Sequence, residues 1–192
     1  MKLRMLSTLV ALALGTGIAT PAFALSDDQV KGWAMSAAKE CQDVLEGAVS
    51  KGQLKLGDVF DRIYVPIPNT DPPKFKTRYD AYSDTHILPI EDGYLAKDSK
   101  LIFVVLVDKN GYLPSHNSKF AKPLTGDKAK DLVGNRSKRM FNDKTGISAA
   151  RSTAPFLLQE YRRDTGEDMK DLSVPVYVKG KHWGAIRFGY KK

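Results

Sequence analysis

A run of seven apolar residues, Leu101 to Val107, constrains the fold more than any other stretch of the sequence. It is rich in β-branched residues, as is typical of a strand buried on both faces. A buried helical segment is the alternative, but the run is short and ends in Asp108-Lys109-Asn110-Gly111. Asn-Gly is the strongest short hairpin signal, because both residues accept positive φ at low cost. The pattern predicts a central strand and a return strand, Tyr112 to Asn117, whose polar and aromatic side chains face a pocket.

The first 24 residues have the features of a secretory signal peptide. Two basic residues precede an apolar segment, Met5 to Ile18, and Ala22-Phe23-Ala24 forms an A-x-A cleavage site. An uncleaved membrane anchor is the alternative, but the segment is short for a bilayer span and is interrupted by two glycines. We therefore expect residues 1–24 to be removed and residues 25–192 to form a single domain in the periplasm.

Charge and cysteine content limit the partners. The sequence has 30 Lys and Arg against 22 Asp and Glu, and its net charge of +8 falls to +6 once Lys2 and Arg4 are removed. Nucleic acid is a poor partner for an exported protein, so the basic excess serves either an anionic ligand or solvation, and charge alone does not decide between them. Cys41 is the single cysteine and falls in a helical pattern, which favours a buried thiol over an intermolecular bridge.

The spacing of apolar residues predicts a long amphipathic helix at the start of the domain. Ser26 resembles an N-cap followed by two acids, and Lys51-Gly52 closes the pattern. This helix can pack on the sheet or on the same helix of a second subunit, which would form a homodimer; the sequence does not separate the two. The apolar stripe contains Val30, Trp33, Ala34, Ala37, Ala38, Cys41, Val44, Leu45 and Val49.

The remaining pattern predicts an α+β domain in which the long N-terminal helix packs on a central antiparallel sheet. Four prolines force an extended path on Tyr64–Pro73. Shorter helices are expected at Asp58–Arg62, at Phe75–Leu95 with a break at Pro89, and at Asp127–Val133. Strands are expected at Ile147–Arg151, Phe156–Arg163, Lys170–Val178 and His182–Tyr190, with turns at Thr165–Asp168 and Lys179–Lys181.

The residues that carry chemistry do not match those of an enzyme. His86, His116 and His182 lack the spacing of a metal site, and no haem-attachment motif is present. A nucleophile elbow, a P-loop and a dinucleotide fingerprint are also missing. Ser115 and His116 would point to opposite faces of a strand and therefore cannot act as nucleophile and base. We expect a protein without catalytic activity, metal or cofactor.

The polar residues that remain are those of a small-molecule pocket. Arg136 and Arg139 would share a face of a helical turn, where either could hold a carboxylate; a solvated basic loop is the alternative. Strand alternation puts Gln159, Tyr161 and Arg163 on one face, which either lines a cavity or forms a partly buried outer surface.

Four segments, in matching order, resemble the extracytoplasmic Cache-type (PAS-like) sensor domains of bacterial methyl-accepting chemotaxis receptors. They are Val107–Asn117, Asn135–Phe141, Leu158–Asp164 and Val174–Gly184, and the similarity extends over residues 60–190. The resemblance implies a long N-terminal helix, a central antiparallel sheet and a pocket for small metabolites, often carboxylates. By position in these segments, the candidate ligand-binding residues are His116, Asn135, Arg136, Arg139, Tyr161 and Arg163.

The sequence differs from that family in the part that would transmit the signal. Chemotaxis receptors continue into a transmembrane helix and a cytoplasmic coiled coil, and this sequence stops at Lys192. We therefore expect a detached periplasmic sensor that binds a small organic acid and acts in signal transduction through a membrane histidine kinase or chemoreceptor. The alternative is a soluble binding protein that delivers a metabolite to a transporter.

Overall fold

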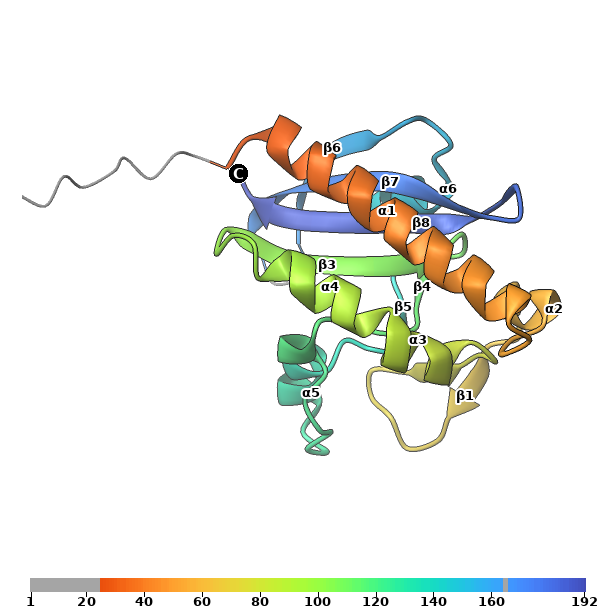
Figure 1. The fold of residues 1–192 in the computed structure, drawn as a ribbon. Coiled ribbons are helices and arrows are strands. Elements are labelled where there is room, and N and C mark those ends of the chain that lie inside the picture. Colours follow the sequence, from red (N-terminus) through yellow and green to blue (C-terminus); the bar gives the residue numbers. More distant parts are fainter. Residues whose placement is uncertain (1–24, 164–165) are drawn as a thin grey trace, which may run out of the picture.

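The computed structural model describes residues 25–163 and 166–192, which form an α+β domain built on a central antiparallel sheet (Figure 1). The sheet has four strands in the order β3–β8–β7–β6. Both the fold class and the antiparallel sheet agree with the prediction, whereas the predicted signal segment, residues 1–24, lies outside the described residues. The strands are β3 (Leu101–Asp108), β6 (Leu157–Arg162), β7 (Asp168–Val178) and β8 (Lys181–Lys191).

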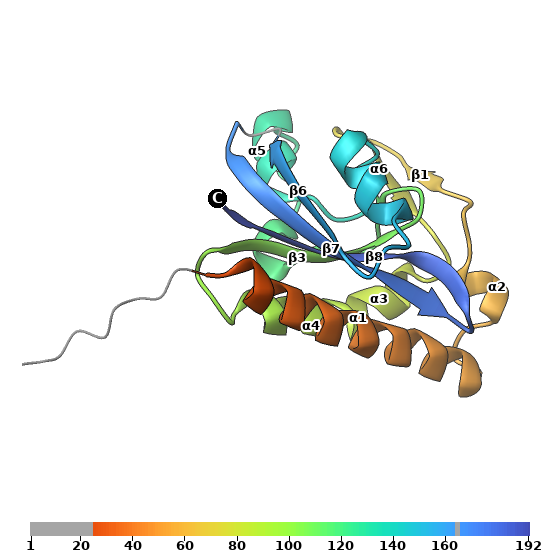
Figure 2. The same cartoon turned by 90° about the horizontal axis from the view of Figure 1, so that it is seen from above.

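Helix α1 (Asp27–Ser50) begins and ends where the sequence predicts. The Ser26 hydroxyl caps it by accepting a hydrogen bond from the Gln29 N–H at 3.1 Å. Its apolar face, including the buried Cys41, packs on the sheet beside α4 (Leu88–Leu95) (Figure 2). The apolar stripe of α1 therefore packs on the sheet of its own chain, which is the first of the two alternatives.

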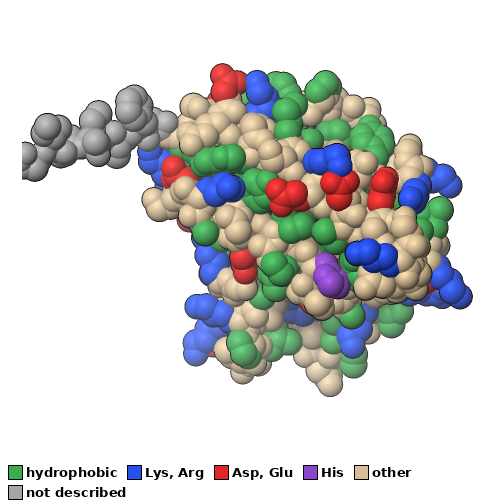
Figure 3. Space-filling view, in the orientation of Figure 1, with side chains coloured by type: hydrophobic (Ala, Val, Ile, Leu, Met, Phe, Trp, Pro, Cys, Tyr) green, Lys and Arg blue, Asp and Glu red, His purple; other side chains and the backbone are tan. Residues whose placement is uncertain are grey.

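The outer face of α1 carries both acidic and basic side chains (Figure 3). Lys31 pairs with Asp28, and Lys39 pairs with Asp43, one helical turn away. Such a face is typical of a solvated helix. Homodimer formation through this helix stays a prediction.

The predicted hairpin after β3 is wrong, although β3 itself is confirmed. β3 pairs antiparallel with β8, and the return segment is only β4 (Tyr112–Leu113), which pairs with β5 (Arg139–Met140). The Asp108 carboxylate accepts hydrogen bonds from the backbone N–H groups of Asn110 and of the first residue of β4, at 2.8 and 3.0 Å. The Gly111 N–H does donate to the Asp108 carbonyl at 2.8 Å, so the turn forms, but the Gly111 carbonyl accepts from the Phe141 N–H at 2.7 Å. The chain after the turn therefore pairs with the segment around β5 and not with β3.

The predicted strand Ile147–Arg151 is also wrong, because this segment belongs to α6 (Lys144–Arg151). Asp143 caps the helix by accepting hydrogen bonds from the Thr145 and Gly146 N–H groups at 3.0 and 3.1 Å. Two buried alanines in the second half of the segment favour a helix, since alanine has the highest helix propensity. The cap and the alanines outweigh the single β-branched isoleucine.

Short elements complete the chain and frame the sheet. The predicted helix at 75–95 divides into two helices that meet at Ile87, and the proline-rich segment forms one strand of a small antiparallel pair. The predicted turn at 165–168 lies partly outside the described residues. These elements are α2 (Leu56–Val59), β1 (Val65–Ile67), β2 (Lys74–Lys76), α3 (Asp80–His86), a 3₁₀ turn at Ser118–Phe120 and α5 (Lys128–Gly134).

The two faces of the sheet differ in what covers them. Helices α1, α3 and α4 lie on one side and enclose the larger apolar cluster, whereas α5 and α6 lie on the other (Figure 2). Trp183 belongs to the larger cluster, where its indole N–H donates to the Val59 carbonyl at 2.7 Å. The second face holds a smaller cluster and several charged side chains. Within the described residues, none of the helices combines the length and the apolar character required to span a membrane.

Candidate ligand-binding pocket

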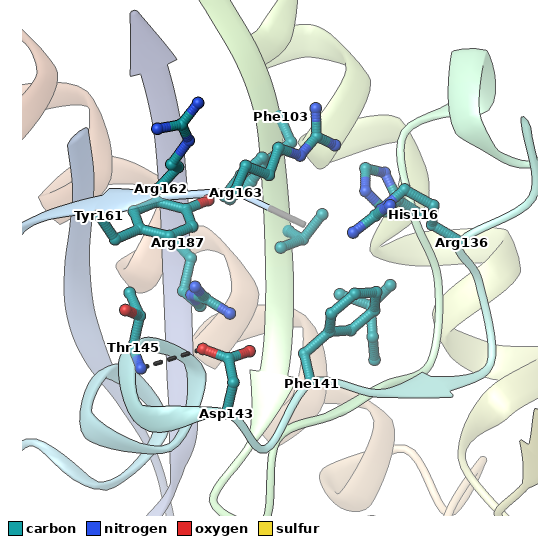
Figure 4. A pocket seen from close by; sticks show the side chains of 12 residues that line it. Phe103, His116, Arg136, Phe141, Asp143, Thr145, Tyr161, Arg162, Arg163 and Arg187 are labelled. Atoms are coloured by element: carbon teal, nitrogen blue, oxygen red, sulfur yellow. Dashed lines mark hydrogen bonds between the residues drawn. The ribbon is translucent and has the colours of Figure 1, made fainter. Parts of the chain in front are cut away.

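The second face of the sheet forms the inner wall of a cavity of about 330 Å³ (Figure 4). Its walls come from β3, β6 and β8, from the segments around His116 and Arg136, and from the start of α6. The residues that line it are Phe103, Val105, Leu113, His116, Arg136, Phe141, Asp143, Thr145, Tyr161, Arg162, Arg163 and Arg187. The lining thus combines an apolar wall with four guanidinium groups and one carboxylate.

Arg187 has the most defined environment of the four arginines. It lies on a central strand, and its Nε and Nη2 donate to one oxygen, Oδ2, of the buried Asp171 at 3.0 and 2.6 Å. Burial works against the charge on Arg187, but attraction by Asp171 outweighs it and raises the guanidinium pKa. Burial likewise raises the pKa of Asp171, opposed by Arg187. Because guanidinium does not lose its proton in proteins, we treat the two groups as an ion pair.

The other three arginines lie around the cavity on less regular segments. Arg162 donates to the Gly166 carbonyl at 3.1 Å, and Arg163 pairs with Glu167 at 3.3 Å. Arg136 donates to the Leu132 carbonyl at 3.4 Å. These contacts hold guanidinium groups near the cavity by bonds to the backbone and to a rim carboxylate.

Two aromatic rings in the lining support the cations. The guanidinium carbons of Arg136 and Arg139 both lie 5.0 Å from the centre of the Phe141 ring. Those of Arg163 and Arg187 lie 5.9 and 5.8 Å from the Phe103 ring. Cation–π contacts of this kind stabilise a charge without using its N–H groups, which remain suited to hydrogen bonding.

His116 is a neutral donor or acceptor in a positive environment. It is buried, and burial, followed by repulsion from Arg136 and Arg163, holds its pKa well below the usual range. Within the described part of the chain, its Nδ1 has no hydrogen-bond partner. A buried polar atom without a partner costs free energy, so a ligand that supplies the bond would be favoured.

Tyr161 and Asp143 add two further polar groups. Burial raises the pKa of Tyr161 to about 12, so its hydroxyl is neutral at physiological pH. Asp143 uses one oxygen to cap α6, and its carboxylate lies below the Arg187 guanidinium in Figure 4. The cavity therefore presents mostly N–H and O–H donors, which suits an anion.

The structure brings four of the six predicted residues together in the lining: His116, Arg136, Tyr161 and Arg163. Asn135 and Arg139 lie outside it. The Asn135 side chain accepts from Lys74 Nζ at 2.7 Å and donates to the Lys122 carbonyl at 2.6 Å.

The predicted helical turn that would align Arg136 and Arg139 is wrong. Lys138 between them has a φ of 62°, and Arg139 begins β5. The two guanidinium groups nevertheless converge, because both donate to the Leu132 carbonyl, at 3.4 and 3.1 Å. The solvated basic loop is wrong as well, since both side chains are buried.

Sequence reasoning missed Phe103, Phe141, Asp143, Thr145, Arg162 and Arg187. Arg187 had a readable signal, since it is the one full charge inside the predicted strand His182–Tyr190. A charge within an otherwise apolar strand needs a buried partner or a polar cavity. Phe103 lies on an apolar strand, Phe141 and Asp143 lie on a loop, and Thr145 and Arg162 lie at the ends of polar elements, α6 and β6, where the pattern carries no such signal.

No protein-family model matches the chain, and no curated protein matches it. Solved structures to which the chain shows a distant similarity include an extracellular ligand binding receptor from Desulfohalobium retbaense, with 14% identity and a TM-score of 0.39 over 87% of this chain and 26% of that one. Another is the sensory domain of the Campylobacter jejuni chemoreceptor Tlp3, with 13% identity and a TM-score of 0.40 over 85% of this chain and 61% of that one. The chain spans less than two thirds of either structure. Likenesses this distant transfer neither a family nor a ligand.

Proposed function

We propose that the protein is a periplasmic sensor domain that binds a small organic acid and acts in signal transduction through a membrane partner, a histidine kinase or a chemoreceptor. The observation that carries the proposal is the cavity of about 330 Å³ whose lining contains four arginines against one aspartate. A volume of this size suits a small metabolite. N–H donors beside aromatic and aliphatic walls suit a carboxylate on a short carbon skeleton.

The position of the cavity supports a sensing role. It lies on one face of the sheet, whereas α1 and α4 lie on the other. A ligand that binds two conformations with different affinity shifts their populations. The helical layer is the surface on which a membrane partner would detect that shift. The sequence resemblance to chemotaxis sensor domains supports the same role.

A thermal-shift screen with acetate, lactate, succinate and benzoate, each beside its neutral amide, tests the ligand class. Binding to the native state alone raises stability by about 2.7 kcal/mol at a hundredfold excess over Kd, which corresponds to a rise in Tm of roughly 5–10 °C. We expect at least one acid to raise Tm and its amide to leave it unchanged. Equal shifts with acid and amide, or no shift with any acid, would contradict the proposal.

A second measurement separates a sensor from a carrier that feeds a transporter. Capture of membrane proteins on immobilised protein, with and without the stabilising acid, should retain a kinase or receptor in a ligand-dependent manner. Retention of transporter subunits alone would favour the carrier. The matched negative control is Arg136→Gln, in which a lining guanidinium is replaced by a neutral group.

A further inference from the structure

Arg187 differs from the other lining arginines in the element that holds it. Arg136 and Arg163 lie on loops, and Arg162 ends an edge strand, but Arg187 lies inside β8, between β3 and β7. Its side chain is about 95% buried and extends from the sheet into the cavity (Figure 4). A functional group on a central strand keeps its position better than one on a loop.

Among the described residues, Arg187 is the hydrogen-bond partner of the Asp171 side chain. The carboxylate is fully buried, and within the described residues its second oxygen, Oδ1, accepts no hydrogen bond. A buried ion pair contributes little net stability, because desolvation of both charges offsets their attraction. The pair therefore needs another explanation, and its location on the cavity face points to the site.

The register of β7 and β8 brings Asp171 and Arg187 close to each other. Asp171 lies opposite Gly189, and Ser173 lies opposite Arg187, so the two charged residues are diagonal neighbours. Gly189 has no side chain to compete for this space, and the Phe103 ring occupies it instead. The ring lies beside the guanidinium and limits its movement.

The bonds to Asp171 leave one edge of the guanidinium for a ligand. Nε and Nη2 both donate to a single carboxylate oxygen, so the Nη1 group and the second Nη2 hydrogen stay available. Among the described residues, none accepts a hydrogen bond from Nη1. Two N–H groups on one planar edge match the two oxygens of a carboxylate.

We propose that Arg187 binds the ligand's carboxylate through this free edge, and that Asp171 is a positioning residue that fixes the guanidinium on the sheet. The inference rests on the proposed function, since it names the residue that recognises the acid. The carboxylate would lie against Phe103 and Val105, whose apolar surfaces lower the local polarity and strengthen charged hydrogen bonds.

Lysine and glutamine substitutions test the role of Arg187. Arg187→Lys keeps the positive charge and the contact with Asp171 but removes the planar edge. We expect the Kd of the acid with the largest thermal shift among acetate, lactate, succinate and benzoate to rise at least tenfold, with the Tm of the free protein nearly unchanged. Arg187→Gln alone leaves a buried carboxylate without a cation and risks unfolding. Arg187→Gln with Asp171→Asn leaves two neutral groups instead, and the same loss of affinity is expected.

The role of Asp171 is tested by the contrast between two substitutions. Asp171→Asn keeps an acceptor oxygen for Nε and Nη2, so binding should be retained, whereas Asp171→Leu should weaken it about tenfold in protein that is still folded by circular dichroism. Arg151→Gln, on the exposed face of α6, is the matched control and should leave Kd unchanged. A structural role alone would not separate asparagine from leucine in folded protein.

These outcomes distinguish a failure of this inference from a failure of the proposed function. Wild-type affinity in both Arg187→Lys and the double variant would overturn the role of Arg187 and leave acid binding intact. Equal affinity of Asp171→Asn and Asp171→Leu would overturn the positioning role. Failure of the unaltered protein to bind any of the four acids would overturn both proposals.

Discussion

The carboxyl group of Glu91 and the hydroxyl of Ser115 are hydrogen-bonded at 3.1 Å, and both residues are buried. The other Glu91 oxygen accepts from the Leu106 N–H of β3 at 2.8 Å. Glu91 therefore joins α4 to the open edge of the sheet and to the segment that continues directly into His116, which lines the cavity. Asn117, on the other side of His116, makes a second connection, since its Nδ2 donates to Asp92 of α4 at 3.3 Å.

The stability of the protein should fall as pH rises toward 8 because of Glu91. Burial raises the pKa of this carboxyl from 4.5 to about 8 in the folded state. Between these values the folded state holds one more proton than the unfolded state. Glu91 by itself therefore lowers the free energy of unfolding by about 1.4 kcal/mol per pH unit, and the decrease ends above pH 8.

Glu91→Gln removes this dependence while keeping both hydrogen bonds, since the amide accepts from Leu106 and donates to Ser115. Relative to wild type, we expect a stability gain that is small at pH 5 and on the order of 2–4 kcal/mol at pH 8. Urea unfolding at both values measures it. Glu40→Gln, on the exposed face of α1, should give no pH-dependent gain; an equal gain there would assign the effect to surface charge.

His116 should remain neutral through the physiological range. Burial, then repulsion by Arg136 and Arg163, lowers its pKa, so the unfolded state binds the proton more readily as pH falls below about 6.5. Below pH 6.5 this residue lowers the free energy of unfolding by at most about 1.4 kcal/mol for each unit that pH falls. Glu91 acts in the opposite direction over the same range, so the stability of wild type should vary little between pH 6.5 and pH 5. His116→Gln keeps only the effect of Glu91 and should gain stability as pH falls over this range.

Imidazole NMR tests the charge state directly. The ring signals of His116 should not titrate between pH 5 and pH 8. A titration of His116 centred near pH 6.5 would contradict the positive environment that the lining arginines create.

The periodic parts of the sequence predicted the fold, and its local side-chain bonds explain where prediction failed. Helix α1 and the strands β6 to β8 follow from apolar spacing and turn residues, because burial on one face imposes that spacing. The hairpin after β3 failed because the chain beyond the turn pairs with β5, which lies far along the sequence and takes the Gly111 carbonyl as an acceptor. Strand 147–151 failed because Asp143 caps a helix there.

The site was predicted in part for a similar reason. His116, Arg136, Tyr161 and Arg163 were named from the order of four segments, and all lie in the lining. Arg187 stood out as the one full charge in its predicted strand, but its role depends on Asp171, which lies on another strand in a register that the sequence does not show. Contacts between strands are set by tertiary packing rather than by local spacing.

Gly189→Ala should disturb the cavity and destabilise the domain. A methyl group at this position would lie 2.1 Å from a ring carbon of Phe103, which forms part of the lining. Overpacking of this kind costs about 1–3 kcal/mol, and movement of the ring should also weaken acid binding. Gly47→Ala in α1, where nothing lies within 4 Å, should instead stabilise by about 0.5–1 kcal/mol. If Gly189→Ala left both stability and acid affinity unchanged, the Phe103 ring would be shown to move without cost.

Lys74→Met should destabilise the domain and weaken ligand binding together, because Lys74 holds the segment that carries Arg136. Its buried ammonium donates to the Asn135 carbonyl, the Asn135 side chain and the Ser137 carbonyl at 3.2, 2.7 and 2.6 Å. Burial, then repulsion by Arg139, lowers its pKa to about 8, so at pH 7 it is mostly charged and all three bonds are present.

Methionine fills a similar volume but leaves three acceptors without a donor, at a cost of about 1–3 kcal/mol. Lys76→Met is the matched control, since Lys76 lies on the same short strand and is exposed. Thermal unfolding and acid titration of both variants should show losses for Lys74 alone. A loss of stability without any loss of affinity would mean that Arg136 keeps its place without this contact.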